Sequence, residues 1–391
     1  MKNTCTMAIH ALAILCCQGI QAEPVVESMV NFPGNSGSAC NTKNGHSAFV
    51  VNENTDRKAP GFDLVRVMPS GPPASTHFET DQGAWASPIL QTFDGGYVIG
   101  GYLETDDPRV GYHGVGFLLR VDSSGNTLWR KPFPTAEGIK SVDIILQMPD
   151  SGFTISGSSS DSFDEITHPV VIRLDKNGIF LGRRKYSNEF AVCRAILKTP
   201  EGGFIMAGES RKALSPTGRD ATLMKTDSLG NPLWVRTYIH FGEGDRVLDL
   251  DTTENGGYIL AGAATGVWPE PYRVLTLLKT DSLGNKIWDS SYRGHLQEEE
   301  VVSVMAMDGG FIGLANAAGA ALVFKMDTNG IMRWYLPEWN GHYSGGSHHL
   351  VKHGPGQFSV LSENPNYGGA HLVRYVDSEF STPGSGAGIQ P

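Results

Sequence analysis

Four histidines near the C-terminal end of the chain form its densest group of residues with metal-binding chemistry. They are His342, His348, His349 and His353. Zinc sites need neutral imidazoles that converge on one ion at about 2 Å. On a single strand, His349 and His353 would share one face about 13 Å apart, while His348 would point to the other face. One strand cannot supply three ligands, so we predict no metal and interpret the cluster as a half-exposed polar strand.

A second set of candidates occupies one position in successive copies of a repeated segment. Asp143, Arg194 and His348 stand at equal distances before a recurrent aromatic residue, and Trp85, Arg246 and Glu298 lie slightly earlier on the same segments. If these segments surround one channel, an acid, a guanidinium and an imidazole meet there. Such a group would suit a polar ligand such as a glycan or a peptide. The alternative is that these side chains only hydrate a water-filled channel.

Aromatic residues in the longest connections are further candidates for ligand binding. The interruptions at 103–114, 161–168, 211–220 and 264–272 each follow the second strand of a unit, so we expect them on one side of the fold. Trp268 lies in the last of these, and Trp339 and His342 lie in a separate segment. Exposed aromatics there would suit sugar stacking or a protein partner, whereas packing onto the fold is the alternative.

Catalytic motifs with a defined spacing are absent from the sequence. It contains no Gly-x-Ser-x-Gly elbow, no His-Glu-x-x-His pair and no phosphate-binding loop. The acidic run 298–300 and the Asp of each repeated turn have ligands for Ca²⁺, but a solvated loop and turn chemistry explain them better. We therefore nominate no catalytic residue and no cofactor.

Two alternating motifs recur along the chain and determine the expected fold. The first is a turn followed by an aromatic residue, as in Asp94-Gly95-Gly96-Tyr97; the second is Asp-x-x-Gly-Asn followed by Trp, as in Asp122 to Trp129. Close copies of the second motif end at Trp234, Trp288 and Trp334. The first-motif aromatics are Phe49, Tyr97, Phe153, Phe204, Tyr258, Phe311 and Phe358. This periodicity predicts seven units of about 50 residues.

Each unit is expected to contain four short antiparallel strands. In the third unit they would cover 141–148, 153–158, 170–174 and 180–185. Asp-Gly and Asn-Gly turns supply the positive φ values that tight hairpins need. One such sheet cannot bury both of its faces, whereas seven sheets arranged radially bury them against one another. The sequence therefore predicts an all-β, seven-bladed β-propeller over residues 23–377, with the recurrent aromatics packed between blades.

Both ends of the chain are expected to take part in closing the ring. The last unit lacks a fourth strand, because residues 378–391 are rich in Gly, Ser and Pro and are expected to form a flexible tail. Residues 25–34 resemble a fourth strand and are predicted to complete the last blade. Cys40 and Cys193 would then lie on innermost strands three blades apart. A disulfide needs Cα atoms within about 7 Å, so we predict two free, mostly buried thiols.

The N-terminus indicates export, and the overall charge restricts the class of partner. Residues 1–22 combine Lys2 with an apolar stretch and a plausible cleavage point after Ala22, which is typical of a signal peptide. A lipoprotein anchor at Cys16 or Cys17 is the alternative. Net charge is −10, and it becomes −11 when residues 1–22, with one Lys and no acid, are removed. This charge argues against nucleic acid and anionic membranes as partners, and no later segment is apolar enough to span a membrane.

The repeats also resemble a known group of proteins. The Gly-Gly-aromatic and Asp-x-x-Gly-Asn-x-x-Trp motifs are similar to those of bacterial secreted β-propellers, over nearly all of the chain after residue 22. More remotely, they resemble the tryptophan-docking repeats of quinoprotein dehydrogenases and of the outer-membrane assembly propeller. Those families usually have a turn one residue longer than the one between Asp122 and Trp129, so no quinone cofactor is expected. The resemblance implies the fold and leaves the activity open.

Together these observations favour a non-enzymatic binding or scaffold propeller. Its ligand would be a protein or a polysaccharide, and its location the periplasm, the cell surface or the medium. The alternative is a carbohydrate-active lyase or hydrolase with its site at the channel mouth, which convergence of Asp143, Arg194 and His348 would favour. A purely structural envelope protein is a third possibility.

Overall fold

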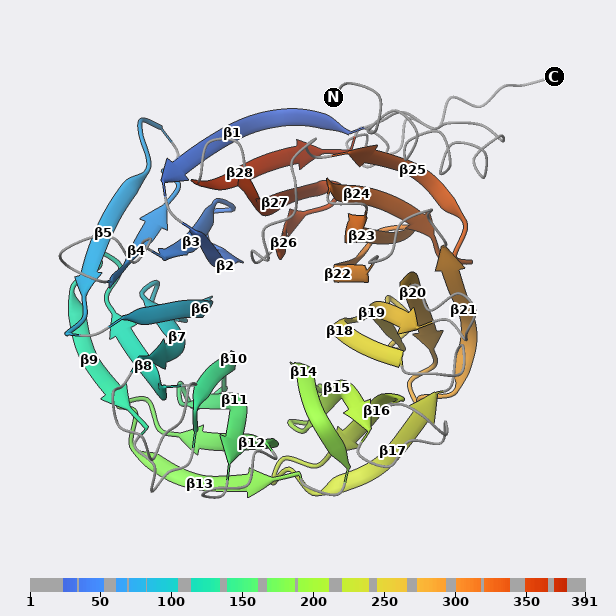
Figure 1. Ribbon diagram of the computed structural model, residues 1–391, viewed down its shortest axis with the longest axis horizontal. Coiled ribbons are helices and arrows are strands. Elements are labelled where there is room, and N and C mark those ends of the chain that lie inside the picture. The colour runs from blue at the N-terminus through green and yellow to red at the C-terminus, as the bar shows by residue number, and fades with distance from the viewer. Residues whose placement is uncertain are drawn as a thin grey trace.

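β-Strands are the regular elements of the part of the chain that the structure describes. This computed structural model describes residues 24–377, except for 34, 53–60, 69, 82, 105–113, 134–138, 161–166, 187–188, 211–219, 239–244, 266–272, 293–299, 318–319, 338–348 and 365–368. Within these residues, 28 strands form seven four-stranded antiparallel sheets. The sheets stand around one axis (Figure 1), so the protein is a seven-bladed β-propeller, as its repeats predicted.

The blades follow one another along the chain, and six of them are formed by four consecutive strands. Their strands run from the ring axis outwards in chain order (Figure 1). Blade 1 contains β2 (Asn35–Asn41), β3 (Ser47–Asn52), β4 (Gly61–Arg66) and β5 (Ala74–Glu79); blade 2 contains β6 (Ala84–Gln91), β7 (Tyr97–Leu103), β8 (Val115–Val121) and β9 (Thr127–Pro132); blade 3 contains β10 (Ser141–Gln147), β11 (Phe153–Ser160), β12 (Thr167–Leu174) and β13 (Phe180–Lys185). Blade 4 contains β14 (Phe190–Lys198), β15 (Phe204–Ser210), β16 (Ala221–Thr226) and β17 (Pro232–Tyr238); blade 5 contains β18 (Asp245–Thr252), β19 (Tyr258–Thr265), β20 (Arg273–Thr280) and β21 (Lys286–Tyr292); blade 6 contains β22 (Glu300–Met307), β23 (Gly310–Ala317), β24 (Ala320–Asp327) and β25 (Met332–Pro337); blade 7 contains β26 (His349–Gly354), β27 (Gln357–Asn364), β28 (Gly369–Val376) and, from the other end of the chain, β1 (Val25–Pro33).

The repeated Asp-x-x-Gly-Asn segments form the turns between the third and fourth strands. In blade 2, Asp122 Oδ1 accepts hydrogen bonds from the backbone N–H groups of Ser124 and Asn126 at 2.9 and 2.8 Å. Gly125 has φ of 94°, which an L side chain rarely adopts. The Asp therefore caps its own turn, as predicted from its recurrence in the sequence.

The tryptophans that follow these turns pack between blades. The ring of Trp129 in blade 2 lies 6.2 Å from that of Phe153 in blade 3, and Trp288 of blade 5 stands in the same relation to Phe311 of blade 6 at 6.1 Å. A Cβ on the turn residue Gly178 would lie 3.2 Å from the Trp129 ring. The glycine of one turn thus makes room for the tryptophan of the preceding blade, which explains why both recur together.

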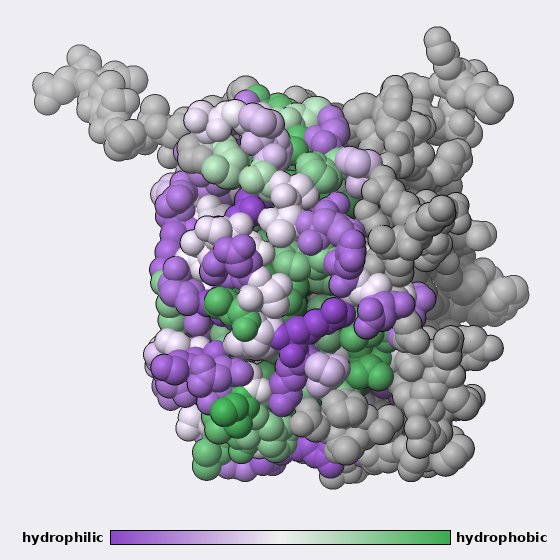
Figure 2. All heavy atoms as spheres, turned by 90° about the vertical axis from the view of Figure 1, so that its left-hand side faces the viewer, coloured by the Kyte–Doolittle hydropathy of each residue, from purple (hydrophilic) through white to green (hydrophobic). Residues whose placement is uncertain are grey.

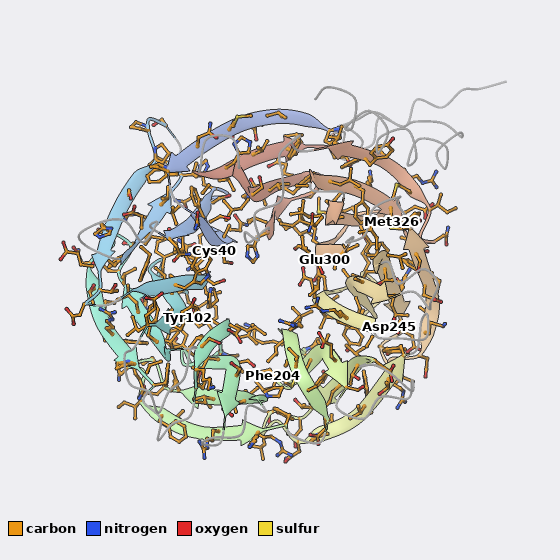
Figure 3. The ribbon with its side chains drawn as sticks, in the orientation of Figure 1. Cys40, Tyr102, Phe204, Asp245, Glu300 and Met326 are labelled. Atoms are coloured by element: carbon orange, nitrogen blue, oxygen red, sulfur yellow. The ribbon has the colours of Figure 1, made fainter. Side chains whose placement is uncertain are left out.

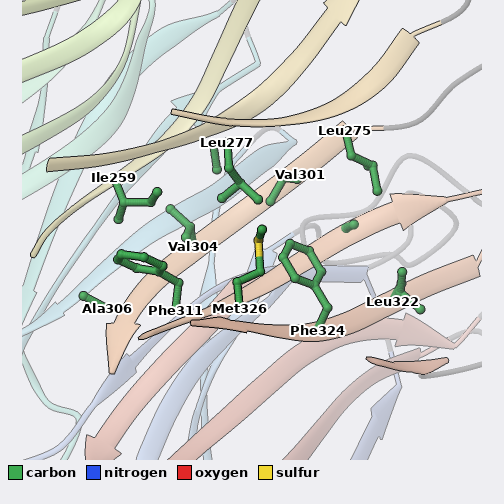
Figure 4. Close-up of a cluster of buried hydrophobic side chains, with 12 residues drawn as sticks. Ile259, Leu275, Leu277, Val301, Val304, Ala306, Phe311, Leu322, Phe324 and Met326 are labelled. Carbon is green, nitrogen blue, oxygen red and sulfur yellow. The ribbon is translucent and has the colours of Figure 1, made fainter. Parts of the chain in front are cut away.

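The hydrophobic core lies between neighbouring blades. Figure 4 shows the cluster between blades 5 and 6, where Ile259 and Leu277 from one blade meet Val304, Phe311 and Met326 from the next. Alternate side chains of each strand face opposite neighbours, so both faces of a sheet are apolar. Each blade consequently depends on the two beside it.

The first and last strands of the described chain pair with each other and close the ring. β1 runs antiparallel to β28, with Met29 opposite Val373 and Phe32 opposite Ala370 (Figure 1). The prediction that the N-terminal segment completes the last blade is therefore confirmed. The predicted signal segment 1–22 and tail 378–391 lie outside the described residues.

A buried ion pair adds to this closure. Lys325 Nζ on β24 of blade 6 lies 2.8 Å from Asp377 Oδ2, directly after β28. The side chains are 4% and 0% exposed. The backbone N–H of Asp377 also donates to the carbonyl of Gly356 at 2.7 Å. The end of the last blade is therefore attached both to its own sheet and to the preceding blade.

Cys40 and Cys193 are free cysteines on innermost strands, as predicted. Cys40 belongs to β2 of blade 1 and Cys193 to β14 of blade 4. Burial raises the pKa of each thiol to about 12. Both sulfur atoms are therefore thiols at neutral pH.

The outer rim exposes edge strands that carry positive charge. β9, β13 and β17 contain Lys or Arg and no acidic residue. Exposed aliphatic side chains such as Leu128 and Leu233 accompany these charges, and Figure 2 shows hydrophilic and hydrophobic residues mixed over one side of this rim. Charged side chains on an edge strand oppose pairing with another chain. Among the described residues, no helix is long and apolar enough to cross a membrane.

Candidate functional site

A bulge in the innermost strand places polar side chains on the wall of the central channel. In blade 3 the pairing of β10 with β11 shifts between Val142 and Ile144, so that Asp143 is the extra residue. Opposite lies Gly157, where a Cβ would come within 1.8 Å of the carbonyl oxygen of Ser141. Only a glycine permits this approach. Asp143 is exposed although it lies in the middle of an innermost strand, so solvent reaches it through the channel.

The same arrangement recurs in the next two blades. In blade 4 the pairing shifts between Cys193 and Ala195, which makes Arg194 the extra, exposed residue opposite Gly208. In blade 5 the extra residue is Leu248, which stands at the same distance before its hairpin aromatic as Asp143 and Arg194 do. Blade 6 differs by one position, because its extra residue is Val302, whereas Val301 is fully buried.

Five charged side chains form a chain of alternating sign across blades 3 to 6. Arg194 Nη2 lies 3.6 Å from Glu209 Oε1, and Arg246 Nε lies 3.6 Å from the same oxygen. Arg246 Nη1 is 3.9 Å from Glu300 Oε2. Asp143 begins the chain, with Arg194 near enough to affect its titration. Figure 3 shows Glu300 on the channel side of its blade. We call these five residues the charged arc.

The environment of Asp143 makes its carboxyl group hold its proton more strongly than usual. Burial raises the pKa, while the hydrogen bond from Ser141 and the charge of Arg194 lower it by less. The side chain is exposed to the channel yet protein surrounds it, and desolvation of this kind disfavours the carboxylate. A perturbed acid beside a cavity is a feature of functional sites.

A pocket of about 310 Å³ adjoins Asp143 between blades 2 and 3. This volume lies at the lower end of the range for small-molecule sites, about 300–1,000 Å³. Trp85 and Tyr102 supply its aromatic surface, and Figure 3 shows Tyr102 on the channel side of blade 2. The complete lining is Trp85, Ser87, Gly101, Tyr102, Ser141, Val142, Asp143 and Ser158. We call it the blade 2–3 pocket.

Four of the candidate residues from the sequence belong to the blade 2–3 pocket or to the charged arc. Trp85 and Asp143 line the blade 2–3 pocket, and Arg194 and Arg246 belong to the charged arc. Five other candidates lie outside the described residues: Glu298, His342, His348, Trp268 and Trp339.

The histidines that the structure describes do not form a metal centre. His353 Nε2 lies 2.8 Å from Ser359 Oγ within blade 7, and its Nδ1 lies 3.0 Å from Asn41 Oδ1 of blade 1. Desolvation lowers the pKa of His353 to about 4, so the ring is neutral and joins the two blades. The described part of the chain contains no group of three or more His, Cys, Asp or Glu side chains that could hold a metal ion.

Several mouth residues on second strands escaped the sequence analysis. Tyr102, Ser158, Glu209 and Asn316 each stand five positions after the aromatic residue of their hairpin. On each second strand, this position directly follows the residue that lies opposite the bulge of the innermost strand, as Ser158 follows Gly157 and Glu209 follows Gly208. A count forward from the aromatic, parallel to the count backward that identified Asp143, would have found them.

Comparisons with known proteins find similarity in structure alone. No family model matches the chain, and no curated protein matches it. A polysaccharide lyase of family PL25, an ulvan lyase solved with -[GlcA(1-4)Rha3S]- bound, is 11% identical over 90% of this chain and 96% of its own, with a TM-score of 0.55. The polysaccharide lyase Uly1 is 9% identical over 90% and 99%, with a TM-score of 0.53.

A propeller of a different kind is equally similar. The WD40 β-propeller domain of Doa1 is 12% identical over 92% of this chain and 99% of its own, with a TM-score of 0.54. At such low identity these similarities establish the fold only.

Proposed function

We propose that this protein is an exported propeller that binds a glycan at the mouth of its central channel, with one sugar ring in the blade 2–3 pocket. The observation that carries the proposal is the lining of that pocket. Trp85 and Tyr102 present aromatic surface, while Asp143 and three serines present hydrogen-bonding groups within the same 310 Å³. A sugar ring has apolar C–H faces and hydroxyl edges, so it needs both kinds of surface together.

The surroundings of the pocket suit a longer chain of sugars. The charged arc continues from Asp143 around the mouth through blades 4, 5 and 6. The side chains of Arg194 and Arg246 are partly exposed, so their guanidinium groups can donate hydrogen bonds to a polar chain. Two of the similar folds are polysaccharide lyases, which is compatible with glycan binding by a propeller. Export is supported by the signal-like segment at 1–22.

The test is a calorimetric screen of oligosaccharides against the wild-type protein and two variants. Trp85→Ala removes one of the two aromatic side chains of the pocket and should weaken binding at least tenfold. Phe93→Ala is the matched control, because Phe93 is an aromatic residue of the same blade, 51% exposed, in the turn at the opposite end of β6. It should bind like the wild type. The proposal would be refuted if the wild type and both variants bound oligosaccharides with equal affinity. It would also be refuted if the wild type bound a partner protein but none of the oligosaccharides.

A carbohydrate-active lyase or hydrolase is the second candidate function. The observation that favours it is Asp143, whose pKa is raised by burial while Arg194 lies nearby. An acid of this kind can serve as a general acid or base. In that case each glycan that binds should be cleaved, with release of new reducing ends. Asp143→Asn should then abolish cleavage and leave binding intact; binding without any new reducing end excludes the enzyme.

A further inference from the structure

The ionisable group that lines the blade 2–3 pocket is acidic. Among its described lining residues Asp143 is the sole formally charged side chain. Glu104, directly after β7, is not part of the lining, but its charge acts on Tyr102 and contributes to the raised pKa of that residue. A ligand group in this pocket thus meets an acid beside an aromatic surface.

Arg194 is shared between two carboxylates, because its charge acts on Asp143 while its Nη2 lies 3.6 Å from Glu209 Oε1. Arg246 lies between Glu209 and Glu300. The charged arc therefore contains three carboxylates, Asp143, Glu209 and Glu300, and two guanidinium groups. The charged arc therefore has one more carboxyl group than guanidinium groups, and Asp143 is the member of the arc that lines the pocket. A cationic group bound beside Asp143 would favour its carboxylate form and be attracted by it, whereas an anionic sugar would be repelled by that form.

The aromatic residues favour the same kind of ligand. The faces of Trp and Tyr rings carry negative electrostatic potential and attract cations. Trp85 and Tyr102 line the pocket together with Asp143. The serines Ser87, Ser141 and Ser158 offer hydroxyl groups that can accept hydrogen bonds from an ammonium group.

We propose that the blade 2–3 pocket selects a sugar residue bearing a free ammonium group, so that the glycan contains amino sugars that are not acetylated. This inference rests on the proposed function and specifies its ligand class. Uronic acids and sulfated sugars, the chemistry of the polymer bound to the PL25 lyase, are the wrong charge for this pocket.

The experiment compares three tetrasaccharides of similar size by calorimetry at pH 6 and low ionic strength. They are the tetramers of glucosamine, N-acetylglucosamine and galacturonic acid. The glucosamine tetramer should bind at least tenfold more tightly than the acetylated one, and the galacturonate tetramer should be the weakest. Raising the ionic strength should reduce the preference for glucosamine, because salt screens the charge interaction.

Two variants attribute the preference to the pocket. Asp143→Asn should bring the glucosamine and N-acetylglucosamine affinities within about twofold of each other, with the acetylated ligand unaffected. Asp308→Asn removes an acid from the exposed turn between β22 and β23 and should retain the full preference. This inference would be overturned if binding depended on Trp85 but showed no preference for glucosamine. It would also be overturned if the preference persisted in Asp143→Asn. Either result would leave the proposal of glycan binding intact. Failure of all three tetramers to bind would refute the proposed function itself for these sugars and the inference with it.

Discussion

The ion pair between Lys325 and Asp377 is expected to be a critical contact for stability. It joins blade 6 to the end of blade 7, and both side chains are almost completely inaccessible to solvent. Asp377→Asn would remove the carboxylate that pairs with the buried ammonium group of Lys325. The complementary substitution, Lys325→Met, would remove the ammonium group that pairs with the buried carboxylate of Asp377.

The expected magnitude follows from the burial of both groups. Removal of one partner of a buried pair costs about 3–5 kcal/mol, because the remaining charge is desolvated without compensation. Replacement of both partners by apolar residues of similar size is often neutral. We therefore expect each single variant to lose about 3–5 kcal/mol of unfolding free energy, and Lys325→Met with Asp377→Leu to lose less than about 1 kcal/mol.

Urea unfolding followed by tryptophan fluorescence measures these differences. Asp150→Asn is the control, because Asp150 pairs with Arg173 at side-chain exposures of 60% and 30%. A pair this exposed contributes at most about 1 kcal/mol. The reasoning is refuted if Asp377→Asn loses no more unfolding free energy than Asp150→Asn does. It is also refuted if the double variant is no more stable than the less stable of the two single variants.

Three further predictions concern the ring and its buried groups. Deletion of residues 24–34 removes β1 and should lower the melting temperature of the whole ring in one cooperative transition; unchanged melting would contradict closure by β1. A thiol assay on the denatured, unreduced protein without residues 1–22 should find two thiols, and the native protein should react slowly because burial raises the pKa of Cys40 and Cys193 to about 12; detection of none would indicate a disulfide. Burial also raises the pKa of Asp249 to about 6, from an ordinary 3.8. Because the folded-state pKa is the higher one, the stability linked to this proton is complete below pH 3.8 and is lost as pH rises through 6, up to about 3 kcal/mol. Asp249→Asn should reduce that loss, and an unaltered pH profile of unfolding would exclude it.

The strands were predictable because each is fixed by a local turn and a hydrophobic pattern. The expected segments 153–158 and 180–185 correspond to β11 at Phe153–Ser160 and β13 at Phe180–Lys185. The ring itself followed from the number of repeats, since a sheet that is apolar on both faces needs two neighbours. Even the long-range pairing of β1 with β28 was implied by a missing strand at one end and a spare strand at the other.

The site was predictable only in part, because its geometry depends on bulges. Asp143 and Arg194 were found from their register, although the sequence did not reveal that each is the extra residue of its strand. Glu209 was missed because its second strand reads as an ordinary buried strand; it lies 3.6 Å from Arg194 and from Arg246 only in the assembled ring. Among the described residues, the contact between Glu209 of blade 4 and Arg246 of blade 5 is not repeated in the other blades, so no recurring motif pointed to it.

The pairing of β1 with β28 has a consequence for the order in which the chain matures. The ribosome synthesises Val25–Pro33 before every other strand of the ring and Gly369–Val376 after all of them. β1 therefore remains without its partner strand until the other strands of the ring have been synthesised. Closure of the ring by the pairing of β1 with β28 is therefore a late step of folding, and the six blades of consecutive strands can form before it.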